Sequence, residues 1–181
     1  MSTALLIIDV QRALCTGEYE CFDIQRVIDT INGLSTKART VNIPVILIQH
    51  EEEGDLLQYG SKGWQLAEGL KTSPQDLRLR KTAPDSFYQT PLHEHLQELD
   101  VDRLIICGLQ TDYCVNATVR EALSRGYDVV LAADAHSTID NGTMSAEDII
   151  SEHNKDLAHL TGSVARIDVV PASEIKIQND L

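Results

Sequence analysis

Residues 103–134 read RLIICGLQTDYCVNATVREALSRGYDVVLAAD, and the pattern of this stretch decides the fold class. The apolar run at 103–108 predicts a strand buried on both faces, and the run at 127–134 predicts another. Between the two runs, apolar residues recur at helical spacing: Val115, Val119, Ala122 and Leu123. Gly126 is a typical helix end. A strand, a helix and a strand in this order predict a parallel pair joined by a crossover helix.

The rest of the chain repeats this alternation of strands and helices. Further strands are expected at 4–9, 44–50, 77–81 and 164–170, and further helices at 22–40, 91–99 and 145–160. Residues 51–76 are polar and rich in turn residues, which is typical of a lid or a long loop. The tail from Pro171 is expected to be a short helix or an extension. The sequence therefore predicts one α/β domain over residues 1–181, with a mainly parallel sheet.

Composition and charge exclude several classes of partner. The formal net charge of −13 would repel the phosphates of nucleic acid and an anionic membrane surface. No apolar run approaches the roughly 20 residues of a membrane span, and the start MSTALLIIDV reads as a first strand rather than a signal peptide. The four cysteines form no C-x-x-C pair. These features predict reduced thiols and a cytoplasmic protein.

Three ionisable side chains lie at or after the carboxyl ends of expected strands, where sites in open parallel sheets are found. They are Asp9, Asp134 and Cys114. Asp9 follows a buried strand, where a carboxylate needs partners, although a loop-capping role fits its position equally well. Thr111 is a plausible helix N-cap, which would place Cys114 in the first turn and lower the pKa of its thiol. A buried, inert cysteine is the alternative.

The other reactive side chains give weaker signals. Cys107 lies inside an apolar run, where core packing is expected, and Cys15 and Cys21 flank a short loop without an evident role. Lys81 lies in the stretch RLRKTAPDSF at 78–87, and lysines in polar stretches of this kind are usually solvated. A functional role for Lys81 would require that it neutralise buried anions. His50 ends an expected strand beside three glutamates, which is more typical of a surface pair than of a metal site.

Three blocks of sequence resemble the isochorismatase-like cysteine hydrolases, and the resemblance extends from the first strand to about residue 170. The blocks are LLIIDVQ at 5–11, RKTAPDSFYQTPL at 80–92 and CGLQTDYCVNATVREAL at 107–123. They occur in the order and at the spacing of that family. The third block is the most specific, since G-x-x-T-D-x-C-V after an apolar strand is rare elsewhere.

The resemblance implies a catalytic triad of Asp9, Lys81 and Cys114. It also implies a cis peptide between Leu109 and Gln110, which would direct the amides of Gln110 and Cys114 at an oxyanion. The implied fold is a three-layer α/β/α sandwich with a Rossmann-like sheet. The implied assembly is a homo-oligomer, either a dimer or a tetramer. A small-molecule substrate is an expectation that follows only from this resemblance.

Departures from the family pattern narrow the expected activity. The region IQHEEEGDLLQYG at 48–60 keeps one histidine and lacks the D-x-H pair of metal-dependent nicotinamidases, so we expect no metal and no cofactor. Isochorismatases proper need no cysteine nucleophile, so Cys114 points to cleavage of a carbon–nitrogen bond in a small amide, carbamoyl compound or lactam. We expect Trp64, Tyr59 and Phe87 to form pocket walls.

Three alternatives remain open at this point. A non-catalytic oligomer of the same fold would bind a metabolite without turning it over, although the intact triad argues against that. A metal-assisted, nicotinamidase-like enzyme would need ligands beyond His50. A thiol redox protein would need a resolving cysteine close to Cys114.

Overall fold

A computed structural model describes residues 2–54, 56–160 and 164–178 of the chain. Its centre is a six-stranded sheet in the order β3-β2-β1-β4-β5-β6, with every pair of neighbours parallel. The strands are β1 (Thr3–Ile8), β2 (Val45–His50), β3 (Leu77–Lys81), β4 (Arg103–Leu109), β5 (Asp128–Ser137) and β6 (Ile167–Val170). All six strands lie where the sequence predicts them, with bounds that differ by up to three residues.

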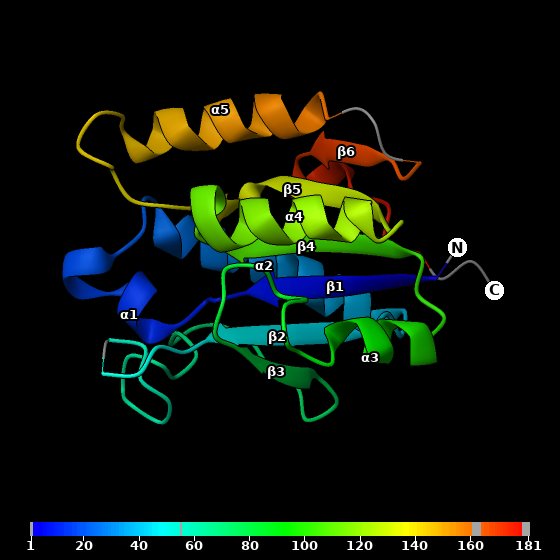
Figure 1. Ribbon diagram of the computed structural model, residues 1–181, viewed down its shortest axis with the longest axis horizontal. Coiled ribbons are helices and arrows are strands. Elements are labelled where there is room, and N and C mark those ends of the chain that lie inside the picture. The colour runs from blue at the N-terminus through cyan, green and yellow to red at the C-terminus, as the bar shows by residue number, and fades with distance from the viewer. Residues whose placement is uncertain (1, 55, 161–163, 179–181) are drawn as a thin grey trace.

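Helices cover both faces of the sheet and make a three-layer α/β/α sandwich (Figure 1). The α-helices are α1 (Arg12–Cys15), α2 (Ile24–Thr40), α3 (Leu92–Glu98), α4 (Asn116–Ser124) and α5 (Ala146–Ala158). Helix α2 lies on one face, while α3 and α4 lie on the other. Short turns complete the chain: η1 (Gly17–Tyr19), η2 (Thr111–Val115) and η3 (Ala172–Glu174). The architecture confirms the expected fold class.

Alternate residues of the central strands fill two separate cores. In β1, Leu5 and Ile7 pack into the core beneath α2, while Leu6 and Ile8 pack into the core beneath α3 and α4. All six residues of β1 are buried, because both faces of a central parallel strand are covered by helices. This explains why the strand reads as a continuous apolar run rather than as an alternating one.

The segment after β4 differs from the single helix that the sequence predicts. Residues Thr111–Val115 form a π-helical turn, and α4 begins only at Asn116. Thr111 does not cap a helix. Its hydroxyl is 2.8 Å from Nδ1 of the buried His136 on β5. Because this hydrogen bond ties the turn to β5, tertiary contacts rather than helix-start chemistry set the geometry around Cys114.

The direction in which successive strands are added reverses between β1 and β4, and such a switch point leaves a crevice at the carboxyl ends of the strands. The carboxyl ends of the strands lie together at the left edge in Figure 1, beside α1 and the long segment between β2 and β3. Ligands in open α/β sheets bind at such a point.

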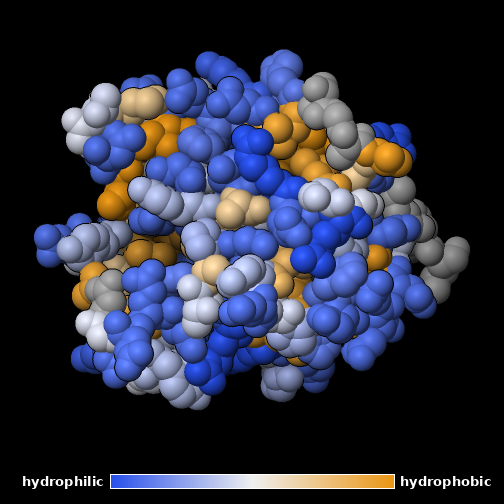
Figure 2. Space-filling view, in the orientation of Figure 1, coloured by the Kyte–Doolittle hydropathy of each residue, from blue (hydrophilic) through white to orange (hydrophobic). Residues whose placement is uncertain are grey.

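The outer surface of the molecule is mainly polar. The face shown in Figure 2 is mostly hydrophilic, with smaller hydrophobic areas at its left and upper right. Among the helices that the structure describes, none combines the length and the apolar character needed to cross a membrane.

Candidate active site

Asp9 follows β1 at the switch point and is almost completely buried. Its backbone has a φ of 52°, a left-handed conformation that aspartate tolerates better than most residues. Its N–H donates to the carbonyl of Ile48 on β2, at 2.9 Å. The carboxylate oxygen Oδ2 lies 2.9 Å from Nζ of Lys81. The other oxygen, Oδ1, is buried without a hydrogen-bond partner among the described residues, so it is free to accept a proton.

Lys81 ends β3 and has a completely buried side chain. A buried ammonium is costly unless it is paired and hydrogen-bonded. Besides Asp9, its Nζ lies 3.0 Å from Nδ1 of His50, 3.1 Å from the carbonyl of Ala83 and 3.2 Å from Sγ of Cys114. Lys81 is therefore a structural part of the cluster and not a solvated lysine.

Cys114 lies within the η2 turn and is partly exposed, unlike the other three cysteines, which are buried. Burial raises the pKa of its thiol to about 12, with a further rise from the charge of Asp9 and an opposing effect of Lys81. The sequence-based prediction of a lowered pKa was wrong, because Cys114 lies before α4 and in a largely desolvated position. The resting thiol therefore carries its proton next to a carboxylate.

The peptide bond between Leu109 and Gln110, before Cys114, is cis, as the resemblance implies. Gly108 precedes it with a φ of 121°, and a Cβ atom there would lie 2.1 Å from the carbonyl oxygen of Ile8. Only glycine allows β4 to approach β1 this closely at the switch point.

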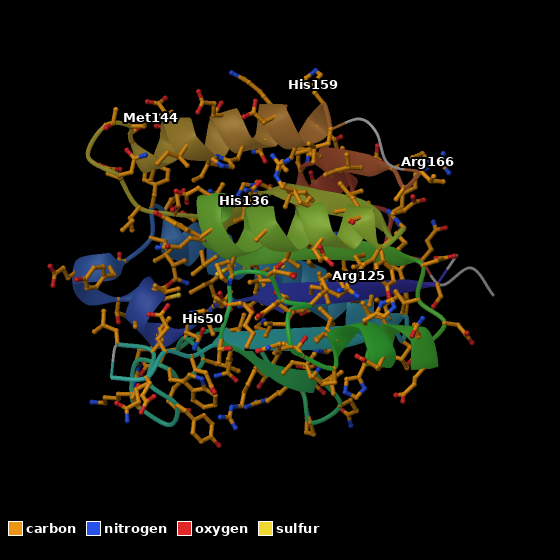
Figure 3. The ribbon with its side chains drawn as sticks, in the orientation of Figure 1. His50, Arg125, His136, Met144, His159 and Arg166 are labelled. Carbon is orange, nitrogen blue, oxygen red and sulfur yellow. The ribbon has the colours of Figure 1, made fainter. Side chains whose placement is uncertain are left out.

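His50 also belongs to the site, a placement that the sequence analysis missed. Its ring is buried at the carboxyl end of β2, where Figure 3 labels it. His50 pairs in register with Lys81 on β3, which explains why the two side chains meet. Its other ring nitrogen, Nε2, lies 2.9 Å from a carboxylate oxygen of Glu52. The only sequence signal for this placement was that His50 and Lys81 both end expected strands. The glutamates next to His50 favoured instead an ion pair at the surface.

Gln11 fastens the ends of β1 and β2 together, and the sequence analysis did not single it out. Its side-chain amide donates to the carbonyl of His50 at 2.9 Å and accepts from the N–H of the same residue at 2.9 Å. Its Nε2 also lies 3.0 Å from the carbonyl of Trp64. The paired contacts hold Asp9 and His50 in a fixed relation.

A cavity of about 270 Å³ opens onto this cluster. Its lining consists of Asp9, Leu14, His50, Glu52, Leu57, Thr82, Pro84, Gln110, Tyr113 and Cys114. A larger hollow of about 630 Å³ lies at the amino ends of β2 and β3, and no cysteine is among its lining residues. The smaller cavity is the candidate substrate site because it alone of these two is lined by a cysteine, which lies beside the buried carboxylate of Asp9.

The three aromatic residues expected as pocket walls lie outside the lining of this cavity. Phe87 is buried in the core and stacks on Tyr127, with ring centroids 5.9 Å apart. Tyr59 and Trp64 pack edge to face at 4.8 Å within the segment between β2 and β3. That segment still contributes to the cavity through Glu52 and Leu57. Aromatic residues close in sequence to site residues were a poor guide, because side-chain direction decides which of them reach the cavity.

One group of side chains has the composition of a metal site. Asp9, His50 and Cys114 offer ligand atoms that all lie within 4.8 Å of one another. The ammonium of Lys81 already contacts all three side chains. A divalent cation held by the same atoms would lie against that ammonium, so the donor set fits the lysine better than a metal.

The fold and the site together define a doubly wound α/β protein with a buried Asp–Lys–Cys cluster at its switch point. The isochorismatase domain model matches residues 3–163. The chain therefore belongs to the isochorismatase family, as the resemblance implied.

Individual relatives agree with this assignment. A streptothricin hydrolase of Streptomyces noursei is 38% identical over 138 residues, which cover 76% of this chain and 55% of that protein. A solved isochorismatase family protein is 36% identical, with a TM-score of 0.83 and coverage of 92% and 97% of the two chains. An isochorismatase from Pseudomonas putida KT2440 is 27% identical, with a TM-score of 0.89 and coverage of 96% and 90%. The chain spans about half the length of the streptothricin hydrolases that it matches.

Proposed function

We propose that this protein is a cysteine-dependent hydrolase that cleaves a carbon–nitrogen bond of a small amide, carbamoyl compound or lactam through a thioester. The observation that carries the proposal is the arrangement of Asp9, Lys81 and Cys114, linked by contacts of 2.9 and 3.2 Å at the wall of a cavity. A cavity of about 270 Å³ suits a small substrate or one reactive end of a larger one.

The first half of the proposed reaction forms the acyl-enzyme. Oδ1 of Asp9 takes the thiol proton of Cys114, and the resulting thiolate attacks the carbonyl carbon of the substrate. The main-chain amides of Gln110 and Cys114 bind the oxyanion that develops. The protonated Asp9 then gives its proton to the leaving nitrogen, the carbon–nitrogen bond breaks, and the amine departs.

The second half releases the acyl group. Asp9 takes a proton from a water molecule, and the hydroxide oxygen attacks the thioester carbon. The carbon–sulfur bond breaks, the acid product leaves, and Cys114 regains its proton from Asp9. Lys81 remains an ammonium throughout and neutralises whichever of the two partners carries the negative charge.

The three alternatives fit the site less well. A metabolite-binding protein has no need for a buried ammonium between a carboxylate and a thiol, which is costly to maintain. A nicotinamidase-like metal would compete with Lys81 for the same atoms. A redox role would need an accessible resolving cysteine for Cys114, and the other three cysteines are buried.

A screen for ammonia or amine release from small amides, ureido compounds and lactams tests the proposal. We expect at least one class to be turned over by the wild type and not by Cys114→Ala. Turnover that persists in the variant would refute the cysteine mechanism. The proposed substrate class would be refuted if the protein hydrolysed only substrates that lack a scissile carbon–nitrogen bond.

A further inference from the structure

We propose that His50 is a positioning residue that reserves a single N–H of Lys81 for Asp9 and Cys114 to share. The ammonium can then serve whichever of the two side chains carries the negative charge. The inference rests on the proposed role of Cys114, but it is tested on the ionisation of the thiol, which needs no substrate.

Lys81 has fewer N–H donors than there are acceptors around it. An ammonium has three N–H groups, and four acceptors surround this one at 2.9 to 3.2 Å. Two of the acceptors, Nδ1 of His50 and the carbonyl of Ala83, remain neutral during the proposed reaction. They occupy two N–H groups, so one is left for both Oδ2 of Asp9 and Sγ of Cys114.

The contacts of His50 fix its tautomer. Lys81 can only donate, so Nδ1 of His50 must accept and carries no proton. An ionised Glu52 can only accept, so Nε2 of His50 must donate. Both contacts select the same neutral tautomer, and the bonds between Gln11 and the backbone of His50 hold the ring in place. His50 is therefore a fixed acceptor for Lys81.

The shared N–H has a chemical consequence. When the proton of Cys114 moves to Oδ1 of Asp9, the S–H bond breaks, an O–H bond forms, and the negative charge moves from the carboxylate to sulfur. The shared N–H then turns from Oδ2 of Asp9 to the thiolate. Little movement is needed, because Nζ of Lys81 already lies 2.9 Å from Oδ2 of Asp9 and 3.2 Å from Sγ of Cys114. Stabilisation of one partner thus comes at the expense of the other, so the ammonium leaves the carboxylate as the negative charge moves to sulfur.

The test replaces the acceptor while keeping the shape of the ring. In His50→Phe a second N–H becomes available, so Asp9 and the thiolate are stabilised together. We expect the pH profile of Cys114 alkylation by iodoacetamide to move about one pH unit lower, as for one charge-assisted hydrogen bond. Turnover should fall at the same time, because one N–H stays on Asp9 and the ammonium no longer passes from the carboxylate to the thiolate. His50→Asn, which places a carbonyl oxygen near the position of Nδ1, should restore the wild-type profile.

A matched control separates this effect from a loss of packing. His93 makes an Nδ1 contact of 2.8 Å to the hydroxyl of Tyr127, away from the cavity, so His93→Phe should leave the profile unchanged. If His50→Phe does not fold, His50→Leu carries the same expectation.

Two results would overturn the proposal. One is a profile for the folded His50 variant that superimposes on that of the wild type or moves to higher pH. The other is a shift in His50→Asn equal to that in His50→Phe. If instead the shift appears but Cys114→Ala retains turnover, the proposed function fails while the assignment of His50 stands.

Discussion

Removal of the buried cation in Lys81→Met is the most informative single perturbation of this site. Methionine fills most of the space of the lysine side chain but leaves Asp9 and Cys114 without a counter-charge. At a contact of 3.2 Å and an effective dielectric of about 20, a lysine–thiolate pair interacts by roughly 5 kcal/mol. This corresponds to an upper limit of about 4 pH units, because 1.36 kcal/mol is about one unit.

Relaxation and entry of water will reduce this effect, so we expect the alkylation profile of Cys114 to move upward by at least about one pH unit. The sign follows from the charge: loss of a cation disfavours the thiolate, and a higher pH is needed to form it. Because the same ammonium contacts both Asp9 and Cys114, its removal changes the electrostatics of the whole site. Turnover should fall on the order of a hundredfold or more, as for loss of one electrostatic donor.

The assay is iodoacetamide modification of Cys114 followed by peptide mass spectrometry across a pH series. Lys37→Met, which removes an exposed lysine on α2, is the matched control and should reproduce the wild-type profile. A superimposable profile for a folded Lys81→Met protein would refute the electrostatic role of this lysine.

Three further predictions concern the nucleophile, the metal question and the backbone. Cys114→Ala should abolish turnover and retain the fold. In the wild type, iodoacetamide should label Cys114 well before the buried Cys107, because burial raises the thiol pKa of Cys107 further. Faster labelling of Cys107 would contradict this prediction. Turnover should survive exhaustive chelation, and its loss with EDTA and recovery with zinc or manganese would show that His50 is a metal ligand. Gly108→Ala should lower the free energy of unfolding by about 2 kcal/mol or more, because the added Cβ meets the carbonyl of Ile8. A denaturant titration with an unchanged midpoint would contradict the close approach of β4 to β1 at Gly108.

The sequence predicted the order of strands and helices because buried parallel strands leave a strong local signal. The continuous apolar runs at 4–9 and 103–108 correspond to β1 and β4, whose residues are almost all buried. It did not predict the π turn at Thr111, because the contact between Thr111 and His136 joins residues that are 25 positions apart.

The candidate site was predictable where a residue follows a strand and where a motif resembles the family. Asp9, Lys81 and Cys114 come together as the resemblance implied. The place of His50 depends on the register of β2 against β3, and the walls of the cavity depend on side-chain direction in a long loop. Neither is encoded in local sequence. The pKa of Cys114 depends on burial, which also could not be read from its position in the chain.

Intact-mass spectrometry of quenched reactions tests most directly whether Cys114 forms a covalent acyl intermediate. With a slowly turned-over substrate or a reactive small ester, we predict an adduct with the mass of the acyl group. Peptide mapping should place the adduct on Cys114, and it should be absent in Cys114→Ala. Burst kinetics should match the stoichiometry of the adduct, with one acyl group for each chain. Turnover at an undiminished rate by Cys114→Ala, without any adduct, would contradict the role of Cys114 as the nucleophile.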